Sequence, residues 1–245
     1  MSASPPRTSD VLVIIPAHNE AEALKGVLDD LQAHANAFDV VVVNDGSTDA
    51  TAAVARMAGY RVLDLCLNLG IGGAVQAGFK YARAQGYEIA VQMDGDGQHP
   101  ADQVELLVAP VRAGECEMSI GSRFLDGNGE YEGSGWRRMG TRFLSWICVL
   151  VTGQRITDAT SGFRAFGPRA LRYLATYYPA DYPEPETIVL LHRQHLAIKE
   201  VSVRMRPRQA GRSSISGVRA VYYMAQVSLS LLLAVFKEGP EQHPA

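Results

Sequence analysis

Cysteine is scarce in this chain and follows no pairing pattern. The three cysteines, Cys66, Cys116 and Cys148, are spread over 245 residues without a C-x-x-C spacing, which excludes a small disulfide-framed protein. Each stands in an apolar or strand-like setting. We therefore expect three buried free thiols and a reducing, cytosolic environment.

A charge excess of either sign is also missing. The chain carries 23 Lys and Arg against 26 Asp and Glu, a formal net charge of −3. A dedicated nucleic-acid-binding protein usually shows a basic excess, so we expect no nucleic-acid partner. Hydrophobic residues make up 47% of the chain and charged residues 20%, which excludes a disordered protein.

No long apolar run stands near residue 1. Residues 1–10 are polar and rich in Ser and Pro, and the first apolar run, residues 11–15, stops at Pro16. This pattern predicts a flexible tail over residues 1–10 and no secretory signal.

Short apolar runs alternate with helical patterns through the first half of the chain. The runs predict strands at residues 11–15, 40–43, 61–65 and 88–93. Apolar residues at helical spacing follow the first strand, at Leu24, Val27, Leu28 and Leu31. A glycine-opened segment, residues 72–85, predicts another helix. The expected fold class is therefore α/β, with a mostly parallel, twisted, Rossmann-like sheet flanked by helices.

The connections and the second half are less regular. Residues 44–49 form a polar turn, in which we expect Ser47 or Thr48 to cap a helix over about residues 49–58. Further along, the pattern predicts a strand at 118–120, a glycine-rich loop at 123–135, a helix at 136–151 and a strand at 198–203.

The C-terminal part changes character. Residues 199–219 hold six basic residues against one acid, Glu200, and residues 220–236 are uncharged but include Gln226, Ser228 and Ser230. Spanning a bilayer takes roughly 20 predominantly apolar residues. We therefore expect an amphipathic helix over residues 217–237 that lies on a membrane or packs on a partner.

Two carboxylates separated by one glycine follow the fourth predicted strand. Asp94 and Asp96, with Gly95 between them and Gln98 in the same turn, can converge on a hard divalent cation. An ordinary acidic turn is the alternative reading. A calcium EF-hand is excluded, because His99 occupies the position that requires glycine.

Other polar clusters also follow strands, and ligands of such sheets bind beyond the carboxyl ends of strands. Asp45 could accept a hydrogen bond from a nucleobase or form an Asx turn. Asn19 stands where it could cap the first helix. Residues 68–73, which include Gly70, could hold a phosphate at a helix start. They lack the full G-x-G-x-x-G pattern, since Val75 occupies its last glycine position.

Four segments in order carry a family resemblance: VLVIIPAHNE, VVVNDGSTDAT, NLGIGGAVQAGF and VQMDGDGQHP. They resemble the nucleotide-sugar half of glycosyltransferase family 2. GSRF (residues 121–124), TSGFRAF (160–166) and VSVRMRPRQAGRSSI (201–215) look like its polyprenyl (dolichyl) phosphate mannose and glucose synthase branch. The resemblance implies a GT-A catalytic domain over residues 11–216, with a nucleotide-sugar half (11–123) and an acceptor half (124–216).

The resemblance also implies roles for matching residues. Contacts to the nucleotide-sugar donor fall on Pro16, Ala17, Asn19, Glu20, Asp45, Gly70, Asp94 and Gly95. The ligands of Mg²⁺ or Mn²⁺ are Asp94, Asp96 and Gln98. Acceptor or product phosphate would face Arg123, Ser161, Arg208 and Ser213, with Arg137 and Arg138 near another family arginine. Many relatives have Lys after the final Ser of this last motif, where this chain has Ser214. Either Arg212 supplies that charge or the phosphate contact is weaker.

The function expected from this pattern is metal-dependent, inverting sugar transfer from a GDP- or UDP-sugar to polyprenyl phosphate. The residues expected to carry out this transfer are Asp94, Asp96, Arg123 and Arg208. The enzyme would lie on the cytosolic, inner face of the membrane, as a homo-oligomer or beside a membrane-protein partner. The sugar, the base and the oligomeric state stay open.

Two alternatives remain. A hydroxyl acceptor would need a base, for which Glu184 and Glu186 are candidates, although both could be exposed acids in a proline-stiffened loop. A non-catalytic nucleotide-sugar-binding protein is the other. His18 and His99 are expected to support turns rather than to act as nucleophiles.

Overall fold

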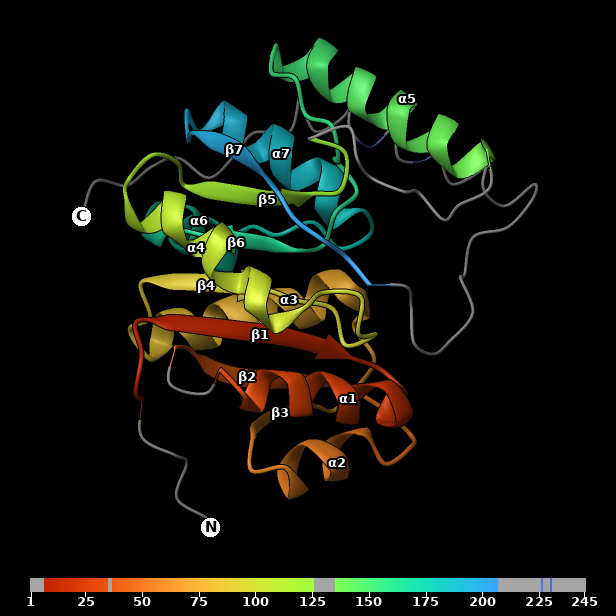
Figure 1. Cartoon of the computed structure of the whole chain (residues 1–245), viewed down its shortest axis with the longest axis vertical. Coiled ribbons are helices and arrows are strands. Elements are labelled where there is room, and N and C mark those ends of the chain that lie inside the picture. The colour runs from red at the N-terminus through yellow and green to blue at the C-terminus, as the bar shows by residue number, and fades with distance from the viewer. Residues whose placement is uncertain (1–6, 35–36, 126–134, 207–225, 227–229, 231–245) are drawn as a thin grey trace.

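A seven-stranded sheet forms the centre of the protein (Figure 1). The computed structural model describes residues 7–34, 37–125, 135–206, 226 and 230. The strand order is β3-β2-β1-β4-β6-β5-β7. The strands are β1 (Val11–Ala17), β2 (Asp39–Asp45), β3 (Arg61–Leu65), β4 (Ile89–Gln92), β5 (Met118–Ser122), β6 (Arg164–Phe166) and β7 (Ile198–Ser202).

Helices cover both faces of the sheet (Figure 1). They are α1 (Ala21–Gln32), α2 (Thr51–Met57), α3 (Gly70–Ala84), α4 (Val104–Arg112), α5 (Gly135–Thr152), α6 (Pro168–Thr176) and α7 (Pro183–Arg193), with a short 3₁₀ turn at Ala101–Gln103. One apolar cluster joins the sheet to α1, α2 and α4, and the other joins it to α3, α5, α6 and α7.

Strand β1 is buried on both faces because its residues alternate between the two clusters. Leu12 and Ile14 point to the α3 side, and Val13 and Ile15 point to the α1 side. The close packing of α3 depends on Gly78, since a Cβ there would stand 2.3 Å from the Ile14 Cγ2 atom. Burial on both faces explains why this strand is a continuous apolar run.

The expected mostly parallel α/β sheet is confirmed. Strand β1 pairs in parallel with β2 and β4, and β2 pairs in parallel with β3. The carboxyl ends of these strands therefore meet at one edge of the sheet. The sheet continues without a break from the 11–123 half into the 124–216 half, since β5 lies beside β6 and β7.

Strand β6 is the exception to the parallel pattern, and the sequence did not predict it. It runs antiparallel to both β4 and β5 and places Arg164 opposite Gln92 and Ile120. Three residues are too few to show the alternation by which a strand is recognised.

Some local expectations were wrong. Helices α4, α6 and α7 were not predicted, and Pro183 lies in the first turn of α7, where its missing N–H is not needed. Neither Ser47 nor Thr48 caps α2; the Thr51 N–H donates instead to the Asp49 carboxylate at 2.9 Å. Cys116 and Cys148 are buried as expected, but Cys66 is exposed.

Two residues of the expected 217–237 helix are described, and both are helical. The Tyr182 hydroxyl donates to the Gln226 side-chain carbonyl at 2.7 Å, and the Ser230 hydroxyl donates to the Glu186 carboxylate. These contacts tie Gln226 and Ser230 to the start of α7. The remainder of the expected helix, residues 126–134 of the expected loop and residues 1–6 of the expected tail lie outside the described residues.

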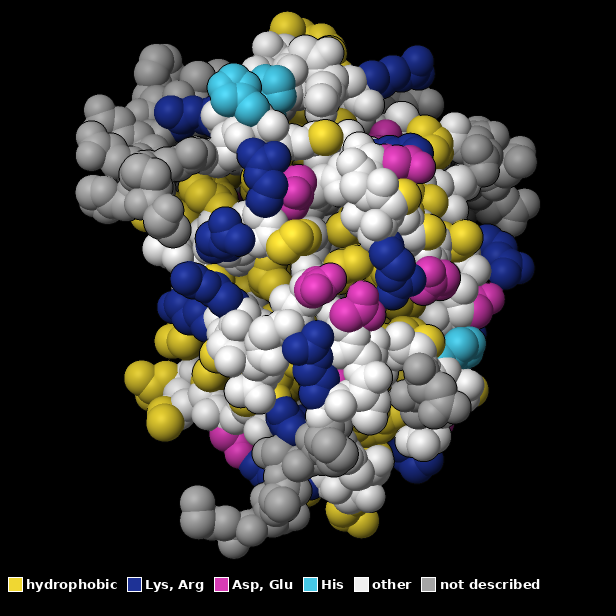
Figure 2. Space-filling model, turned by 90° about the vertical axis from the view of Figure 1, so that its left-hand side faces the viewer, with side chains coloured by type: hydrophobic (Ala, Val, Ile, Leu, Met, Phe, Trp, Pro, Cys, Tyr) yellow, Lys and Arg dark blue, Asp and Glu magenta, His cyan; other side chains and the backbone are white. Residues whose placement is uncertain are grey.

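Charges of both signs share the side of the molecule where the strands begin (Figure 2). Arg112 lies 2.8 Å from Glu105 and 3.6 Å from Asp10, and Lys199 lies 2.5 Å from Glu115. Across the described part of the chain, no helix is both long and apolar enough to cross a membrane.

Candidate functional site

The loops after β1 and β2 are joined through Asn19 at the carboxyl edge of the sheet. Its side-chain carbonyl accepts the Thr48 N–H at 2.8 Å, and its own N–H donates to the Ser47 hydroxyl at 3.0 Å. Asn19 has a φ of 54°, a left-handed conformation that asparagine tolerates. It is therefore a bridge between two loops and not the cap of α1, a position that Glu20 occupies.

His18 supports the same pair of loops, as the sequence indicated. Its Nδ1 lies 2.7 Å from the Asp45 carbonyl oxygen, and its Nε2 lies 3.1 Å from the Asn19 side-chain nitrogen. A carbonyl only accepts, so we assign the proton to Nδ1 and the acceptor role to Nε2.

Asp45 connects the end of β2 to the start of α3. Its buried carboxylate accepts the Leu69 N–H at 2.7 Å, directly before Gly70. Gly46 follows in a left-handed conformation, and a Cβ on it would stand 2.7 Å from the Asn68 nitrogen. The close approach of the two loops at this point therefore requires glycine.

The Asp94-Gly95-Asp96 turn lies against the loop after β1. A Cβ on Gly95 would stand 2.4 Å from a Glu20 carboxylate oxygen and 3.5 Å from the Pro16 carbonyl oxygen. The side chain of Asp94 is 35% exposed, whereas Asp96 is buried. Four predicted donor residues, Pro16, Glu20, Asp94 and Gly95, are thus brought to one place.

His99 holds this turn in place through its buried imidazole ring. Its Nδ1 accepts the Asp94 N–H at 3.0 Å, and its ring stacks on Phe163 with the ring centroids 4.6 Å apart. Burial lowers the pKa of His99 to about 4, so the ring is neutral near neutral pH. The proton then lies on Nε2, 3.8 Å from the Asp94 carboxylate.

The donor set of this turn fits a hard cation. In the described ranges, no three His, Cys, Asp or Glu side chains gather into a group that could hold a metal by themselves. Asp94 and Asp96 carboxylates, with the half-buried Gln98 amide, offer only oxygen ligands. Mg²⁺ is commonly held by one or two carboxylates together with substrate phosphates, so a partial cage of this kind suits it.

Arg123, at the end of β5, forms a two-point ion pair with Asp158. The Nε–Oδ2 distance is 2.7 Å and the Nη2–Oδ1 distance is 2.9 Å, and the Asp158 side chain is fully buried. Glu200 of β7 holds the same loop, accepting the Thr157 and Asp158 N–H groups at 2.8 Å each. Sequence reasoning identified Arg123 and missed Asp158.

The TSGFRAF segment meets the Asp94 turn. A Cβ on Gly162 would stand 3.0 Å from both carboxylate oxygens of Asp94. Ser161 is buried beside it, and its hydroxyl accepts the Phe163 N–H at 3.3 Å. Residues from the expected donor half and the expected acceptor half therefore lie in contact.

Arg164 of the same segment was also missed. It is fully buried, and its guanidinium donates to the carbonyl oxygens of Ala159, Ser161 and Glu184. Burial lowers its pKa from the usual value. The available signal was a charged residue flanked by apolar residues in Phe163–Phe166.

The two glutamates considered as general bases, Glu184 and Glu186, differ in burial. Glu186 is only 3% exposed and accepts a hydrogen bond from Ser230, so its expected exposure in a loop was wrong. Glu184 lies half-buried in the first turn of α7. Burial raises the pKa of Glu184, Arg164 opposes that rise, and the negative charge of Asp94 adds to it.

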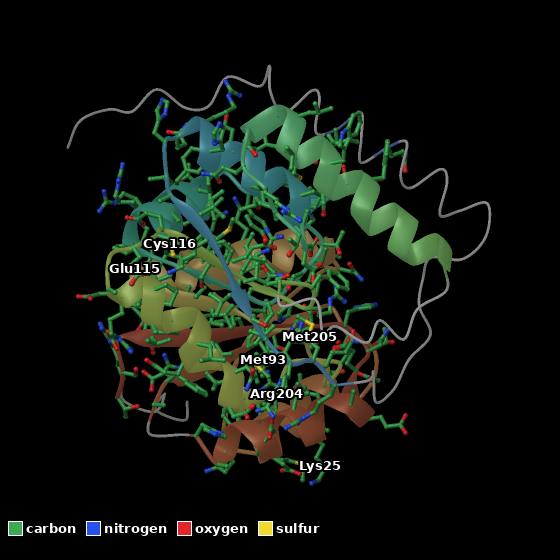
Figure 3. All side chains as sticks on the ribbon, turned by 45° about the horizontal axis from the view of Figure 1, so that its top comes forward. Lys25, Met93, Glu115, Cys116, Arg204 and Met205 are labelled. Atoms are coloured by element: carbon green, nitrogen blue, oxygen red, sulfur yellow. The ribbon has the colours of Figure 1, made fainter. Side chains whose placement is uncertain are left out.

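Part of the predicted phosphate-binding set lies outside the described residues. Arg208 and Ser213 lie outside the described residues, as do the side chains of Arg137 and Arg138 on α5. The chain leading toward Arg208 is well held: the Arg206 N–H donates to the Gln98 carbonyl at 2.9 Å. Met205 packs against the same apolar cluster as Met93, and both are labelled in Figure 3.

A separate cavity of about 190 Å³ lies at the opposite edge, where the strands begin. Its lining includes Asp39, Tyr60, Arg61, Tyr81 and Tyr87. The Tyr87 hydroxyl donates to Asp39 at 2.9 Å, and Arg61 lies over the Tyr81 ring. This cavity contains none of the residues predicted for the site.

Comparison with known proteins identifies the family. The model of glycosyl transferase family 2 matches residues 12–174. The chain belongs to this family. UDP-N-acetylglucosamine–dolichyl-phosphate N-acetylglucosaminyltransferase of Methanococcus voltae is 30% identical over 213 residues, covering 79% of this chain and 84% of that protein. Undecaprenyl-phosphate mannosyltransferase of Micrococcus luteus is 35% identical over 171 residues, covering 66% and 68%.

These relatives confirm the resemblance to the polyprenyl-phosphate branch of glycosyltransferase family 2. A solved structure supports the fold. Glucosyl-3-phosphoglycerate synthase from Mycobacterium tuberculosis, in complex with Mn²⁺, UDP-glucose and phosphoglyceric acid, superposes with a TM-score of 0.72. It is 22% identical, and the match covers 96% of this chain and 81% of that one. The expected GT-A fold is thereby confirmed.

Proposed function

We propose that this protein is an inverting, metal-dependent glycosyltransferase that moves one sugar from a UDP- or GDP-sugar to polyprenyl phosphate. The observation that carries the proposal is the contact between Gly162 and the Asp94 carboxylate. It joins the turn suited to a donor diphosphate with the loop that adjoins Arg123. Donor and acceptor would therefore meet at one edge of the sheet, inside a family of glycosyltransferases.

The donor's nucleoside would lie against the loops after β1 and β2. Asp45 would accept a hydrogen bond from the base, with Asn19 and Glu20 lining the loop that Pro16 and Ala17 begin. Helix α3 begins at Gly70, whose own N–H donates to the Asn68 side-chain carbonyl at 2.9 Å. The N–H groups that follow Gly70 lack helical partners and would face the diphosphate. The relative from Methanococcus voltae is named for a UDP-sugar donor, which favours uridine as the base.

Asp94, Asp96 and Gln98 would hold Mg²⁺ or Mn²⁺. When bound, the cation acts as a Lewis acid that neutralises the charge developing on the departing diphosphate. The protein's own contribution is orientation: His99 fixes the backbone of Asp94 through its N–H, and Asp96 accepts the Gln98 N–H at 3.0 Å. These contacts fix the backbone of Asp94 and one carboxylate oxygen of Asp96.

Arg123 would present its guanidinium to the acceptor phosphate, with Ser161 nearby and Arg208 and Ser213 supplied by the chain after Arg206. A phosphate acceptor is already anionic near neutral pH, so its attack on the anomeric carbon needs no general base. Bidentate contacts from arginine to phosphate oxygens would orient that attack from the side opposite the leaving group.

A membrane position follows from the nature of that acceptor. A polyprenyl chain stays in lipid, so the enzyme would work at a membrane surface, which we propose to be the cytosolic, inner face. The names of the relatives favour a lipid acceptor, since they include dolichyl and undecaprenyl phosphate. Helix α5 supports it with exposed Phe143, Trp146 and Leu150 at helical spacing.

Glu184 favours one second candidate, the same donor chemistry with a hydroxyl acceptor. It lies half-buried at the start of α7, and its burial raises its pKa, the direction in which a carboxylate becomes a better general base. Glu186 no longer suits that role, because it is buried and bonded to Ser230.

One experiment separates the two acceptors. UDP and GDP are first screened with Mn²⁺ for thermal stabilisation of the protein, and the matching labelled sugar nucleotide is then incubated with polyprenyl phosphate. Label in the organic extract supports the lipid acceptor. Label transferred to a water-soluble hydroxyl acceptor, lost in Glu184→Gln, supports the second candidate. No transfer to either with bound donor would overturn both.

A further inference from the structure

Arg164 is a buried cation bonded entirely to backbone carbonyl groups. Its Nε donates to the Ser161 carbonyl at 2.7 Å, one Nη to the Glu184 carbonyl at 2.6 Å and the other to the Ala159 carbonyl at 3.0 Å. No carboxylate touches it among the described contacts, although Glu184 and Asp158 stabilise its charge from further away.

Those three carbonyl groups belong to two separate elements. Ala159 and Ser161 lie in the loop before β6, and Glu184 lies in the first turn of α7. The next residue of that loop, Gly162, is in contact with the Asp94 carboxylate. The planar guanidinium therefore links, through hydrogen bonds, the loop that contains Gly162 to the start of α7.

A link of this kind costs stability that an apolar residue would not cost. Burying a guanidinium is unfavourable, and replacing buried charged groups with apolar ones of similar volume is often neutral or stabilising. What the planar fork provides is geometry, since its donors reach three acceptors in fixed directions. A lysine ammonium at the same position would hold fewer of these carbonyls in place.

We propose that Arg164 is a positioning residue for the carboxylate turn: it holds the 159–162 loop so that Gly162 confines the Asp94 carboxylate in the orientation that binds a divalent cation. This inference rests on the proposed function, because it concerns the same cation. Arg164 does not touch substrate or metal. It acts through Gly162, and it ties the same loop to Glu184 on the acceptor side.

The test measures metal binding without turnover. Mn²⁺ is titrated into the full chain in the presence of UDP or GDP, whichever stabilises the wild-type protein, and free Mn²⁺ is followed by electron paramagnetic resonance. We expect half-saturation to require roughly tenfold more Mn²⁺ in Arg164→Lys, a size usual for residues that orient a metal ligand. Gly162→Ala, which crowds both Asp94 oxygens, should shift the curve in the same direction.

A matched control separates position from general stability. Leu31→Ala removes a buried side chain at the end of α1, away from the carboxyl edge. It should lower the melting temperature while leaving Mn²⁺ half-saturation within about twofold of wild type. An Arg164→Lys curve that matches this control would overturn the inference, since Arg164 would then serve stability alone.

Two further outcomes are decisive. If Arg164→Lys does not unfold cooperatively, Arg164→Gln takes its place, and failure of both variants to fold would overturn the positioning role in favour of a purely structural one. A wild-type protein that binds neither nucleotide with Mn²⁺ would overturn the proposed function and this inference together. Wild-type binding with unshifted Arg164 variants overturns the inference only.

Discussion

Asp158 holds Arg123 in a single orientation at the carboxyl edge of the sheet. Both Asp158 oxygens accept hydrogen bonds from the guanidinium, at 2.7 Å and 2.9 Å, and the carboxylate has no exposure to water. Two parallel bonds fix the plane of the guanidinium as well as its position. The arginine that faces the edge is therefore already ordered before any acceptor arrives.

Asp158→Asn should weaken this arrangement without removing Arg123. The amide can accept one hydrogen bond but has lost the charge, so the free energy of unfolding should fall by roughly 1–3 kcal/mol. The KM for polyprenyl phosphate should rise several-fold, while the affinity for the nucleotide donor stays the same. Denaturant unfolding and steady-state kinetics with each substrate varied measure these effects.

Glu115→Gln is the matched control, because Glu115 pairs with Lys199 on the exposed amino-edge surface. Exposed pairs contribute little to stability, so neither the free energy of unfolding nor either KM should change much. An unaltered acceptor KM in Asp158→Asn would show that Arg123 does not meet the acceptor.

Asp96→Asn should abolish transfer and leave the fold unchanged. The amide oxygen can still accept the Gln98 N–H that Asp96 accepts at 3.0 Å, so the turn keeps its shape. The lost carboxylate charge removes a ligand that a hard cation requires. Transfer assays and circular dichroism test the two statements. A chelator should abolish the transfer activity of the wild-type enzyme, and added Mn²⁺ should restore that activity. Full activity with chelator present would refute the metal role.

The loops proposed to face the donor could be located from the sequence for a physical reason. Strands that are buried on both faces produce continuous apolar runs, and the turns after them carry the polar residues. The sequence pattern therefore predicts β1, β2 and β4 together with the loops that follow them. Asp45 and Asp94 stand at these strand ends. Their approach to one edge then follows from parallel pairing.

The features that the sequence did not predict depend on contacts between segments that are far apart in the chain. Arg164 sits in a three-residue strand, and its role depends on carbonyl groups as far away as Glu184. Glu186 looked like a loop acid because its hydrogen-bond partner, Ser230, stands more than forty residues later. Cys66 looked buried because it follows an apolar run, yet the chain leaves the sheet before reaching it. Local pattern contains no information on such partners.

Asp45→Asn should weaken nucleotide binding while preserving the loop. The amide oxygen can still accept the Leu69 N–H, which Asp45 accepts at 2.7 Å, but the charge that would bind a base N–H is gone. A hydrogen bond to a charged group contributes about 1.5–3 kcal/mol, so the dissociation constant for UDP or GDP should rise roughly tenfold or more. Titration calorimetry measures it.

Asp49→Asn serves as the comparison for Asp45. Asp49 lies in the loop after β2 and accepts the Thr51 and Ala21 N–H groups, whereas the Leu69 N–H is accepted by Asp45. The variant should melt at a lower temperature with an unchanged nucleotide dissociation constant. Equal losses of affinity in the two variants would mean that Asp45 acts only through loop stability.

Asp30→Asn should lower stability in a pH-dependent way. Burial works to raise the pKa of Asp30, but the Ala101 N–H and the Arg206 guanidinium outweigh it and the pKa lies below the usual value. The stabilisation is therefore fully present above the unfolded-state pKa, about 3.9, and is lost as the pH falls through the lower folded-state value.

Urea unfolding of wild type and Asp30→Asn at pH 7 and at pH 3 tests this sign. The difference in unfolding free energy should be about 1 kcal/mol at pH 7, as for a partly exposed ion pair, and should shrink at pH 3. Lys25→Gln, which removes the exposed Lys25–Asp29 pair on the same helix, should show a smaller difference at pH 7. A difference that grows on acidification contradicts the assignment.

Helix α5 should contribute to membrane binding through its exposed apolar side chains. Trp146 and Leu150 are 57% and 63% exposed, and the Trp146 ring stacks on Phe143 with 6.1 Å between centroids. Tryptophan and phenylalanine are favoured at lipid–water interfaces. Replacing Trp146 and Leu150 with Gln should cost about 2 kcal/mol or more of binding energy, a loss of at least tenfold in affinity for vesicles.

Sedimentation with phosphatidylcholine vesicles containing phosphatidylglycerol measures that affinity. Met57→Gln is the control, since Met57 is 88% exposed on α2, at the other end of the sheet order. It should bind vesicles like the wild type. In Trp146→Gln/Leu150→Gln, transfer to a short-chain, water-soluble polyprenyl phosphate should survive, because the carboxyl edge is untouched. Unchanged vesicle binding in the double variant would exclude α5 as a lipid-facing surface.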